Sequence, residues 1–93
     1  MPDTKKIAKD IYLQWQKIKQ AEGKFKHKPY YTYSGVNIYT IRVDEYICPD
    51  GSDGIDVRFI KVLNKKIYQK VISFGSEKDY RENAWHEMVE DEF

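Results

Sequence analysis

The sequence contains little that would suggest secretion, a membrane or a disulfide framework. Its single cysteine, Cys48, excludes an intramolecular disulfide, so the fold has to be held by its core. No stretch approaches the roughly 18 consecutive apolar residues of a membrane-spanning helix. The N-terminus leads into an amphipathic pattern and not into the short apolar run of a signal peptide. We therefore expect a protein of the reducing cytoplasm.

Residues for catalysis or metal binding are equally scarce. The only histidines, His27 and His86, have no close companions, whereas a zinc site needs three or four closely spaced ligands. The loop at residues 50–56 holds three aspartates, but it lacks the alternating acids and the closing glutamate of a calcium-binding loop. No serine or cysteine is flanked by the pattern of an activated nucleophile. We expect no enzyme activity, no cofactor and no metal.

The composition is that of one folded domain covering residues 1–93. The chain is 41% apolar and 33% charged, which is too hydrophobic for disorder and too charged for a membrane protein. A chain of 93 residues has room for one hydrophobic core.

The N-terminal segment is expected to be helical. Ile7, Ile11, Trp15 and Ile18 recur at the spacing that places side chains on one stripe of an α-helix. Asp3 or Thr4 is expected to cap its start. Gly23 is expected to end it, because glycine leaves a helix without a Cβ penalty.

The middle of the chain predicts four antiparallel strands. The first two are Tyr30–Tyr33 and Val36–Cys48, joined at Ser34-Gly35; the third begins at Ile55, and Asn64-Lys65 turns it into the fourth. A two-residue turn there places Val57 opposite Ile72 and Ile55 opposite Phe74. In the second strand one alternate set of residues is expected to face the core, with Glu45 as its anomaly: Tyr39, Ile41, Val43, Glu45 and Ile47.

A second helix is expected at the C-terminus. Ser76 followed by Asp79 fits a helix-capping pattern. A buried stripe is expected from residues about one turn apart, Tyr80, Ala84 and Met88, together with Trp85. The predicted fold is therefore α+β: an N-terminal helix, a four-stranded antiparallel meander and a C-terminal helix, with both helices packed on one face of the sheet.

This order of elements is similar to that of the double-stranded RNA-binding domain, which reads RNA shape through a basic start to its final helix. The corresponding stretch here, residues 74–80, has one lysine between two acids where that family has a lysine cluster. The similarity covers topology only, with an additional strand, and implies no site residues.

Charge is distributed unevenly along the chain, although the net charge is only +1. Residues 1–28 contain eight lysines against three carboxylates, a net charge of +5, and residues 76–93 contain seven carboxylates against two cations, a net charge of −5. Such asymmetry indicates charged partners, unless the two ends neutralise each other.

Two kinds of binding surface follow from this distribution. The first hypothesis is a non-enzymatic regulator or inhibitor that contacts another protein through its charged helices. Its candidate residues lie on the acidic segment: Glu82, Trp85, Glu87, Glu90, Asp91, Glu92 and Phe93. The tyrosine-rich first strand could also offer an exposed edge, including one for a homodimer.

The alternative hypothesis is a domain that binds RNA or single-stranded nucleic acid. Lysines neutralise phosphates, and aromatic faces stack on unpaired bases. The candidate residues belong to the first helix and the segment after it: Lys17, Lys19, Lys24, Lys26, Lys28, Tyr30, Tyr31 and Tyr33. Tyrosines that alternate on an outer strand are also ordinary sheet residues with hydrated hydroxyls.

Overall fold

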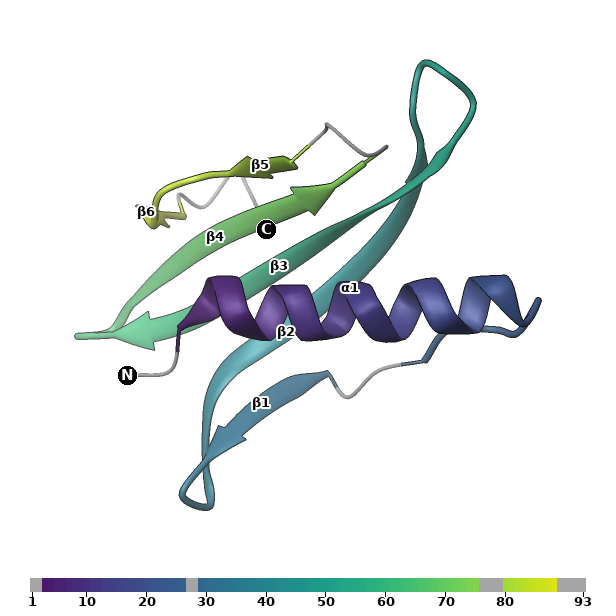
Figure 1. Cartoon of the computed structure of the whole chain (residues 1–93). Helices are drawn as coiled ribbons and strands as arrows, with labels where there is room; N and C mark the ends of the chain where they lie inside the picture. Colours follow the sequence, from purple (N-terminus) through teal and green to yellow (C-terminus); the bar gives the residue numbers. More distant parts are fainter. Residues whose placement is uncertain (1–2, 27–28, 76–79, 89–93) are drawn as a thin grey trace.

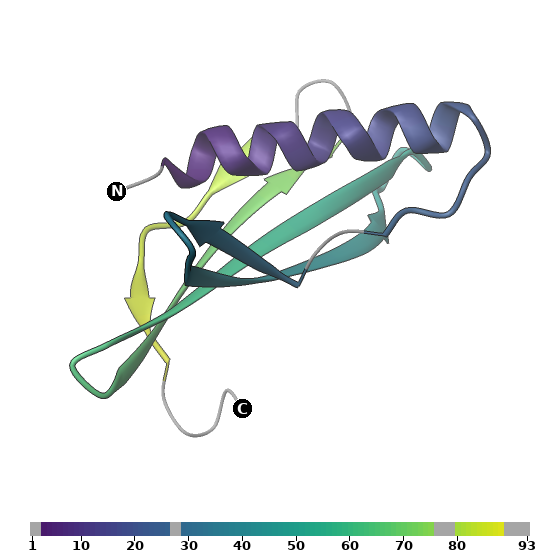
Figure 2. The ribbon, with the colours of Figure 1, turned by 90° about the horizontal axis from the view of Figure 1, so that it is seen from below.

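The protein is described by a computed structural model, which covers residues 3–26, 29–75 and 80–88. One helix lies across one face of an antiparallel sheet (Figures 1 and 2). In chain order the elements are α1 (Thr4–Gln20), β1 (Tyr30–Tyr33), β2 (Val36–Ile47), β3 (Asp53–Leu63), β4 (Lys66–Phe74), β5 (Tyr80–Glu82) and β6 (His86–Glu87). The expected α+β fold with a meander is confirmed.

Helix α1 begins and ends through local hydrogen bonds. The carboxylate of Asp3 accepts from the backbone amide of Lys5 at 3.0 Å, so Asp3 is the cap and Thr4 is buried. At the other end the left-handed residue is Glu22, with φ 56°, and not Gly23. Gly23 makes a close approach there: a Cβ at this position would lie 3.2 Å from Cγ2 of Ile18, so the Ile18 side chain would have to shift slightly.

The strands pair in the order β1-β2-β3-β4-β5, and β6 also pairs with β4. Both short hairpin turns use positive φ at both central residues, 51° and 79° at Ser34-Gly35 and 52° and 63° at Asn64-Lys65. Such turns match the right-handed twist of the strands they join. The predicted register of β3 and β4 is confirmed, because Val57 pairs with Ile72 and Ile55 pairs with Phe74.

The core lies between α1 and the sheet. It consists of helix residues and the alternate strand residues that face them: Ile7, Ala8, Trp15, Tyr39, Ile41, Ile55, Val57, Phe59 and Ile72. Glu45 tolerates its place on this face because its carboxylate binds Nζ of Lys19 at 3.1 Å. Ile47, at the end of the same set, is 74% exposed.

The expected C-terminal helix is wrong for the residues that the structure describes in that region. Tyr80 and Glu82 pair with Phe74 and Ile72 of β4, so residues 80–82 extend the sheet. The amide of Met88 donates to the carbonyl of Ile67 at 2.8 Å, further along β4. The outer edge of β4 thus offers a ladder of backbone partners that outweighs the helical spacing.

With α1 as the single helix of the described residues, the expectation of two helices on one face is also wrong, and the order departs further from that of the double-stranded RNA-binding domain. The parts of the predicted helix at residues 76–79 and 89–93 lie outside the described residues. No helix in the described ranges is both long enough and apolar enough to cross a membrane.

Candidate binding groove

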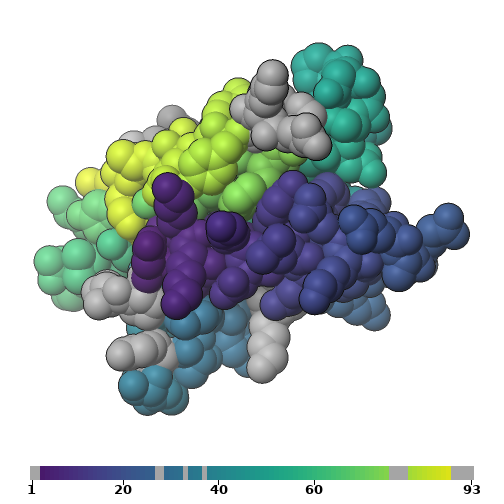
Figure 3. Space-filling model, viewed as in Figure 1, coloured from purple at the N-terminus to yellow at the C-terminus, as the bar shows by residue number. Residues whose placement is uncertain are grey.

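A groove of about 650 Å³ lies between α1 and the first two strands. It exists because α1 is displaced toward the other side of the sheet, where it contacts β3 and β4. The ring of Tyr12 stacks on Phe74 of β4, with 4.5 Å between centroids, and anchors the helix there. In Figure 3 the helix forms a ridge, with β5 on one side and the β1–β2 hairpin on the other.

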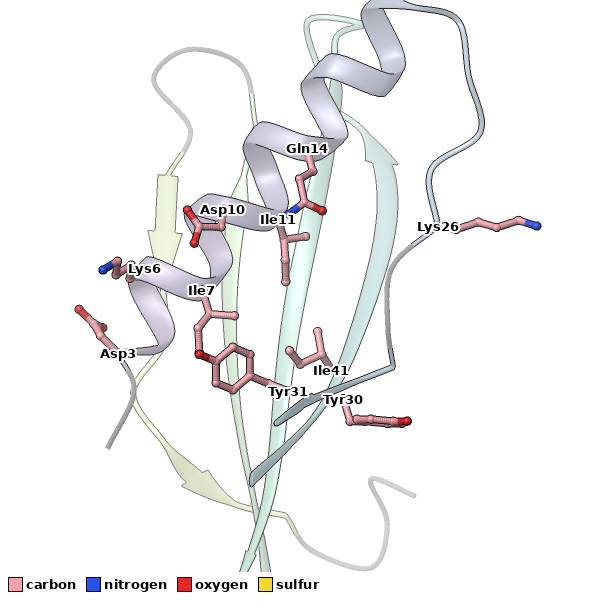
Figure 4. Close-up of a pocket in the computed structure, with 10 residues that line it drawn as sticks. All are labelled: Asp3, Lys6, Ile7, Asp10, Ile11, Gln14, Lys26, Tyr30, Tyr31 and Ile41. Atoms are coloured by element: carbon pink, nitrogen blue, oxygen red, sulfur yellow. The ribbon is translucent and has the colours of Figure 1, made fainter. Parts of the chain in front are cut away.

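The floor of the groove is apolar. Ile7 and Ile11 descend from the helix, while Tyr31 of β1 and Ile41 of β2 rise from the sheet (Figure 4). Ile7 and Ile41 are buried, whereas Ile11 and Tyr31 are half-buried, so the last two are accessible from the groove. A volume between about 300 and 1,000 Å³ with an apolar floor is typical of ligand-binding clefts.

The rim carries charges of both signs. Asp3, Lys6, Asp10 and Gln14 line it from the helix, and Lys26 and Tyr30 line it from the other side. Among the described residues, none of the ion pairs includes Lys6, Asp10 or Lys26. The rim can therefore offer both ammonium donors and carboxylate acceptors to a bound group.

The groove runs beside the outermost strand on this side of the sheet. β1 pairs with β2, and no other strand of the described residues pairs with it. The pairing shifts by one residue between Tyr31 and Thr32, which is a β-bulge. Tyr31 stays on the groove side, opposite Tyr39, while Tyr30 is 47% exposed. The edge of a sheet and an apolar cleft thus lie together.

The structure brings together only part of the expected nucleic-acid surface. Lys26, Tyr30 and Tyr31 all line the groove, with the side chains of Lys26 and Tyr30 extending away from its floor (Figure 4). Lys17 and Lys24 are exposed but do not line it. Lys19 is occupied by Glu45 at 3.1 Å and Asp53 at 3.8 Å, and its hydrogen bond to Glu45 raises the Lys19 pKa above 10.5. Lys28 and the side chain of Tyr33 lie outside the described residues.

The acidic candidates lack the helix on which they were expected. Glu82 binds Lys70 at 2.7 Å and accepts from the hydroxyl of Tyr80 at 2.9 Å, and the bond to Lys70 lowers the Glu82 pKa below 4.5. Glu87 lies 3.9 Å from Lys66. The remaining acidic-segment residues, Glu90, Asp91, Glu92 and Phe93, lie outside the described residues.

Trp85 packs against the sheet. Its ring stacks on Tyr39, with 5.8 Å between centroids, and the ammonium of Lys61 lies 4.0 Å from its centroid. It is half-buried and belongs to the margin of the core. Trp85 is therefore committed to intramolecular contacts on the helix-bearing face.

Sequence reasoning missed the helix side of the groove. Asp3, Lys6, Asp10 and Gln14 follow one another at three- and four-residue intervals, which places them on a single stripe of α1 beside Ile7 and Ile11. That spacing is visible in the sequence. It does not by itself distinguish a groove rim from an ordinary hydrated helix face.

Comparison with protein-family models, with curated proteins and with solved structures finds no match for this chain. Within residues 3–26, 29–75 and 80–88, no group of three or more histidine, cysteine, aspartate or glutamate side chains is placed to hold a metal ion.

Proposed function

We propose that the protein is a non-enzymatic binding module that takes an extended segment of a partner protein into the groove between α1 and β1. The observation that carries the proposal is an apolar-floored groove beside a sheet edge. A segment added next to β1 would gain backbone hydrogen bonds, and its alternate side chains would enter the groove. Such a module would act as a regulator or an inhibitor, because the segment of the partner that it binds is no longer available for other contacts.

The lining indicates the chemistry of the segment. Ile11 and Tyr31 favour apolar side chains at alternate positions. Lys6 and Asp10 on the helix side and Lys26 on the other side favour a segment with charges of both signs. β1 has four residues, so the directly paired part spans roughly 13 Å, and we expect affinities in the micromolar range.

The proposal is tested by selecting binders from a randomised peptide display library and measuring their affinity by fluorescence polarisation. Ile11→Asp places a charge on the groove floor, and Leu13→Asp is the matched control, because Leu13 is 46% exposed on the same helix and does not line the groove. Ile11→Asp should weaken binding at least about tenfold, and Leu13→Asp less than about twofold.

A second variant guards against unfolding by Ile11→Asp. Asp10→Lys changes only an exposed rim charge, and it should weaken peptides with basic residues while sparing those with acidic residues. Failure to enrich any peptide would contradict the proposal. Equal losses with Ile11→Asp and Leu13→Asp, in variants whose circular dichroism matches the wild type, would do so too.

A second candidate function, the binding of single-stranded nucleic acid, is supported by the presence of Lys26, Tyr30 and Tyr31 along the groove. The carboxylates of Asp3 and Asp10 on the same rim would repel phosphates, which is why the peptide is favoured. A labelled oligonucleotide titrated at low and then rising salt tests this candidate. The affinity should fall steeply with salt, and absence of binding at low salt would remove it.

A further inference from the structure

The face of the sheet opposite α1 bears no helix or strand of the described residues (Figure 2). Its apolar residues include Ile60, Val62, Ile67 and Val71, and Val62 is 69% exposed. At its centre the register of β2 and β3 aligns two rows of like charge. Arg42 pairs with Arg58, and Asp44 pairs with Asp56 in the next row.

Arg81 of β5 continues the aspartate row beyond Ser73, but no ion pair of the described residues neutralises either row. Like charges directly opposite each other on a sheet are destabilising. None of the ion pairs found in the described part of the chain involves Arg42, Arg58, Asp44 or Asp56. Asp56 accepts one hydrogen bond, from the hydroxyl of Ser73 at 2.6 Å, and Nε of Arg58 is buried without a partner. The partly desolvated guanidinium of Arg58 would therefore gain from a carboxylate supplied from outside.

The spacing of the rows makes this face complementary to itself. The rows are two residues apart along the strands, which is about 7 Å. A two-fold axis that crosses the strands between them would lay the arginine row of one copy over the aspartate row of another. Arg42 would face Asp44 of the second copy, and Arg58 would face Asp56 of the second copy. All four like-charge pairs of the two copies would be neutralised at once.

We propose that this face is the interface of a homodimer, with the two sheets packed face to face about that axis. The flanking rows fit the arrangement. The ring of Tyr46 lies flat on Gly54, where a Cβ would come within 2.5 Å of the ring, and it forms a smooth platform in the row next to the aspartates. The same axis brings this platform over the row of Thr40 and Ile60 of the other copy.

The area involved sets the strength of the dimer. Four rows across three strands cover roughly 400 Å² per copy. Stable protein interfaces bury about 800 Å² per partner, so we expect a weak dimer whose association depends on salt. A nucleic acid is a poorer occupant of this face, because the aspartate row would repel phosphates held by the arginine row.

The symmetry predicts a result that few other arrangements would give. Arg42→Glu leaves two acidic residues on β2, at positions 42 and 44, and Asp44→Arg leaves two basic residues there. Because the axis places position 42 of one copy over position 44 of the other, like charges would meet and neither variant should pair with itself. Mixed together, they should pair, because each supplies the charges that the other now needs. Both side chains are exposed, and each reversal turns a like-charge cross-strand pair into an opposite one, so both variants should fold.

The experiment is sedimentation equilibrium at about 50 mM and about 500 mM salt. The wild type should rise from 11.1 kDa toward twice that mass with concentration at low salt, and less so at high salt. Each single variant should lose at least about tenfold in association constant. The equimolar mixture and the double variant R42E/D44R should both recover to within about threefold of the wild type.

Lys9→Glu is the matched control, since it changes the net charge as Arg42→Glu does but lies exposed on α1. Lys9→Glu should leave the association constant unchanged.

A wild type that stays monomeric at millimolar concentration and low salt would overturn the proposal. A mixture that stays monomeric would also overturn it, as would single variants that dimerise like the wild type, which would point to pairing through the β1 edge instead. Oligonucleotide binding strengthened by Asp44→Arg without any dimer would reassign the face to nucleic acid.

Discussion

Replacing Trp85 with alanine should destabilise the fold, because the Trp85 side chain packs against the margin of the core on the helix-bearing face of the sheet. Its ring stacks on Tyr39 at 5.8 Å between centroids and lies under the ammonium of Lys61 at 4.0 Å. The substitution distinguishes a packed Trp85 from one displayed on a solvated helix as an anchor for a partner.

The magnitude follows from these contacts. A tryptophan covers about 150–250 Å², and burying half of that contributes roughly 2–3 kcal/mol at about 25 cal/mol per Å². The aromatic pair and the cation–π contact each contribute about 0.5–1 kcal/mol beyond area, and these contributions overlap. We expect Trp85→Ala to lower the free energy of unfolding by about 3 kcal/mol.

Urea denaturation followed by circular dichroism measures this change. Leu13→Ala, which truncates an exposed side chain of α1, should cost less than about 0.5 kcal/mol and serves as the control. A double-mutant cycle of Trp85→Ala with Lys61→Met should give a coupling of about 0.5–1 kcal/mol. A loss below about 1 kcal/mol for Trp85→Ala, with no coupling to Lys61, would refute the packing described here and return Trp85 to the candidate partner anchors.

Three further changes test other parts of the fold. Glu82→Gln should be less stable than the wild type at about pH 6, and this difference in stability should shrink as pH falls. Lys70 holds the Glu82 pKa below 4.5, so the stability that the Glu82 carboxylate contributes is present above pH 4.5 and is lost as pH drops through the lower pKa of the folded state. Thermal melts of both proteins from about pH 6 to pH 3 measure the difference, and a difference that does not change with pH would contradict this prediction. Lys65→Gly should raise the free energy of unfolding in urea by about 0.5–1 kcal/mol, since Lys65 holds φ 63° in a two-residue turn, and a loss of stability would argue against that turn. Phe59→Ala should cost about 3–5 kcal/mol in the same assay, because Phe59 is fully buried, and a cost below about 1 kcal/mol would displace it from the core.

The local parts of the fold were readable from the sequence. The spacing of Ile7, Ile11 and Trp15 predicts α1 because a helix repeats every 3.6 residues, whatever lies beneath it. The alternation in β3 and β4 predicts their register, because a shift by one residue would turn every apolar side chain to the wrong face. Three of the residues predicted from the sequence to bind nucleic acid, Lys26, Tyr30 and Tyr31, line the groove, and that binding stays a prediction.

The C-terminal segment could not be predicted correctly from its local sequence pattern. Tyr80, Ala84 and Met88 have helical spacing, yet residues 80–82 are a strand, because β4 presents an outer edge whose backbone groups need partners. That edge is created by the whole sheet and leaves no trace in the segment itself. The weak helical preference of this segment is outweighed by the backbone hydrogen bonds that the outer edge of β4 offers once the sheet has assembled.

What the sequence determined by itself is a set of features that depend on neighbours a few residues apart: α1, the two hairpin turns and the alternation of the strands. What only the tertiary structure decided is the lateral position of α1 against β3 and β4, which the stacking of Tyr12 on Phe74 helps to hold and which leaves the groove open beside β1. The physical reason is that side-chain periodicity is a property of the chain, whereas the placement of one element on another depends on shapes that meet only after folding.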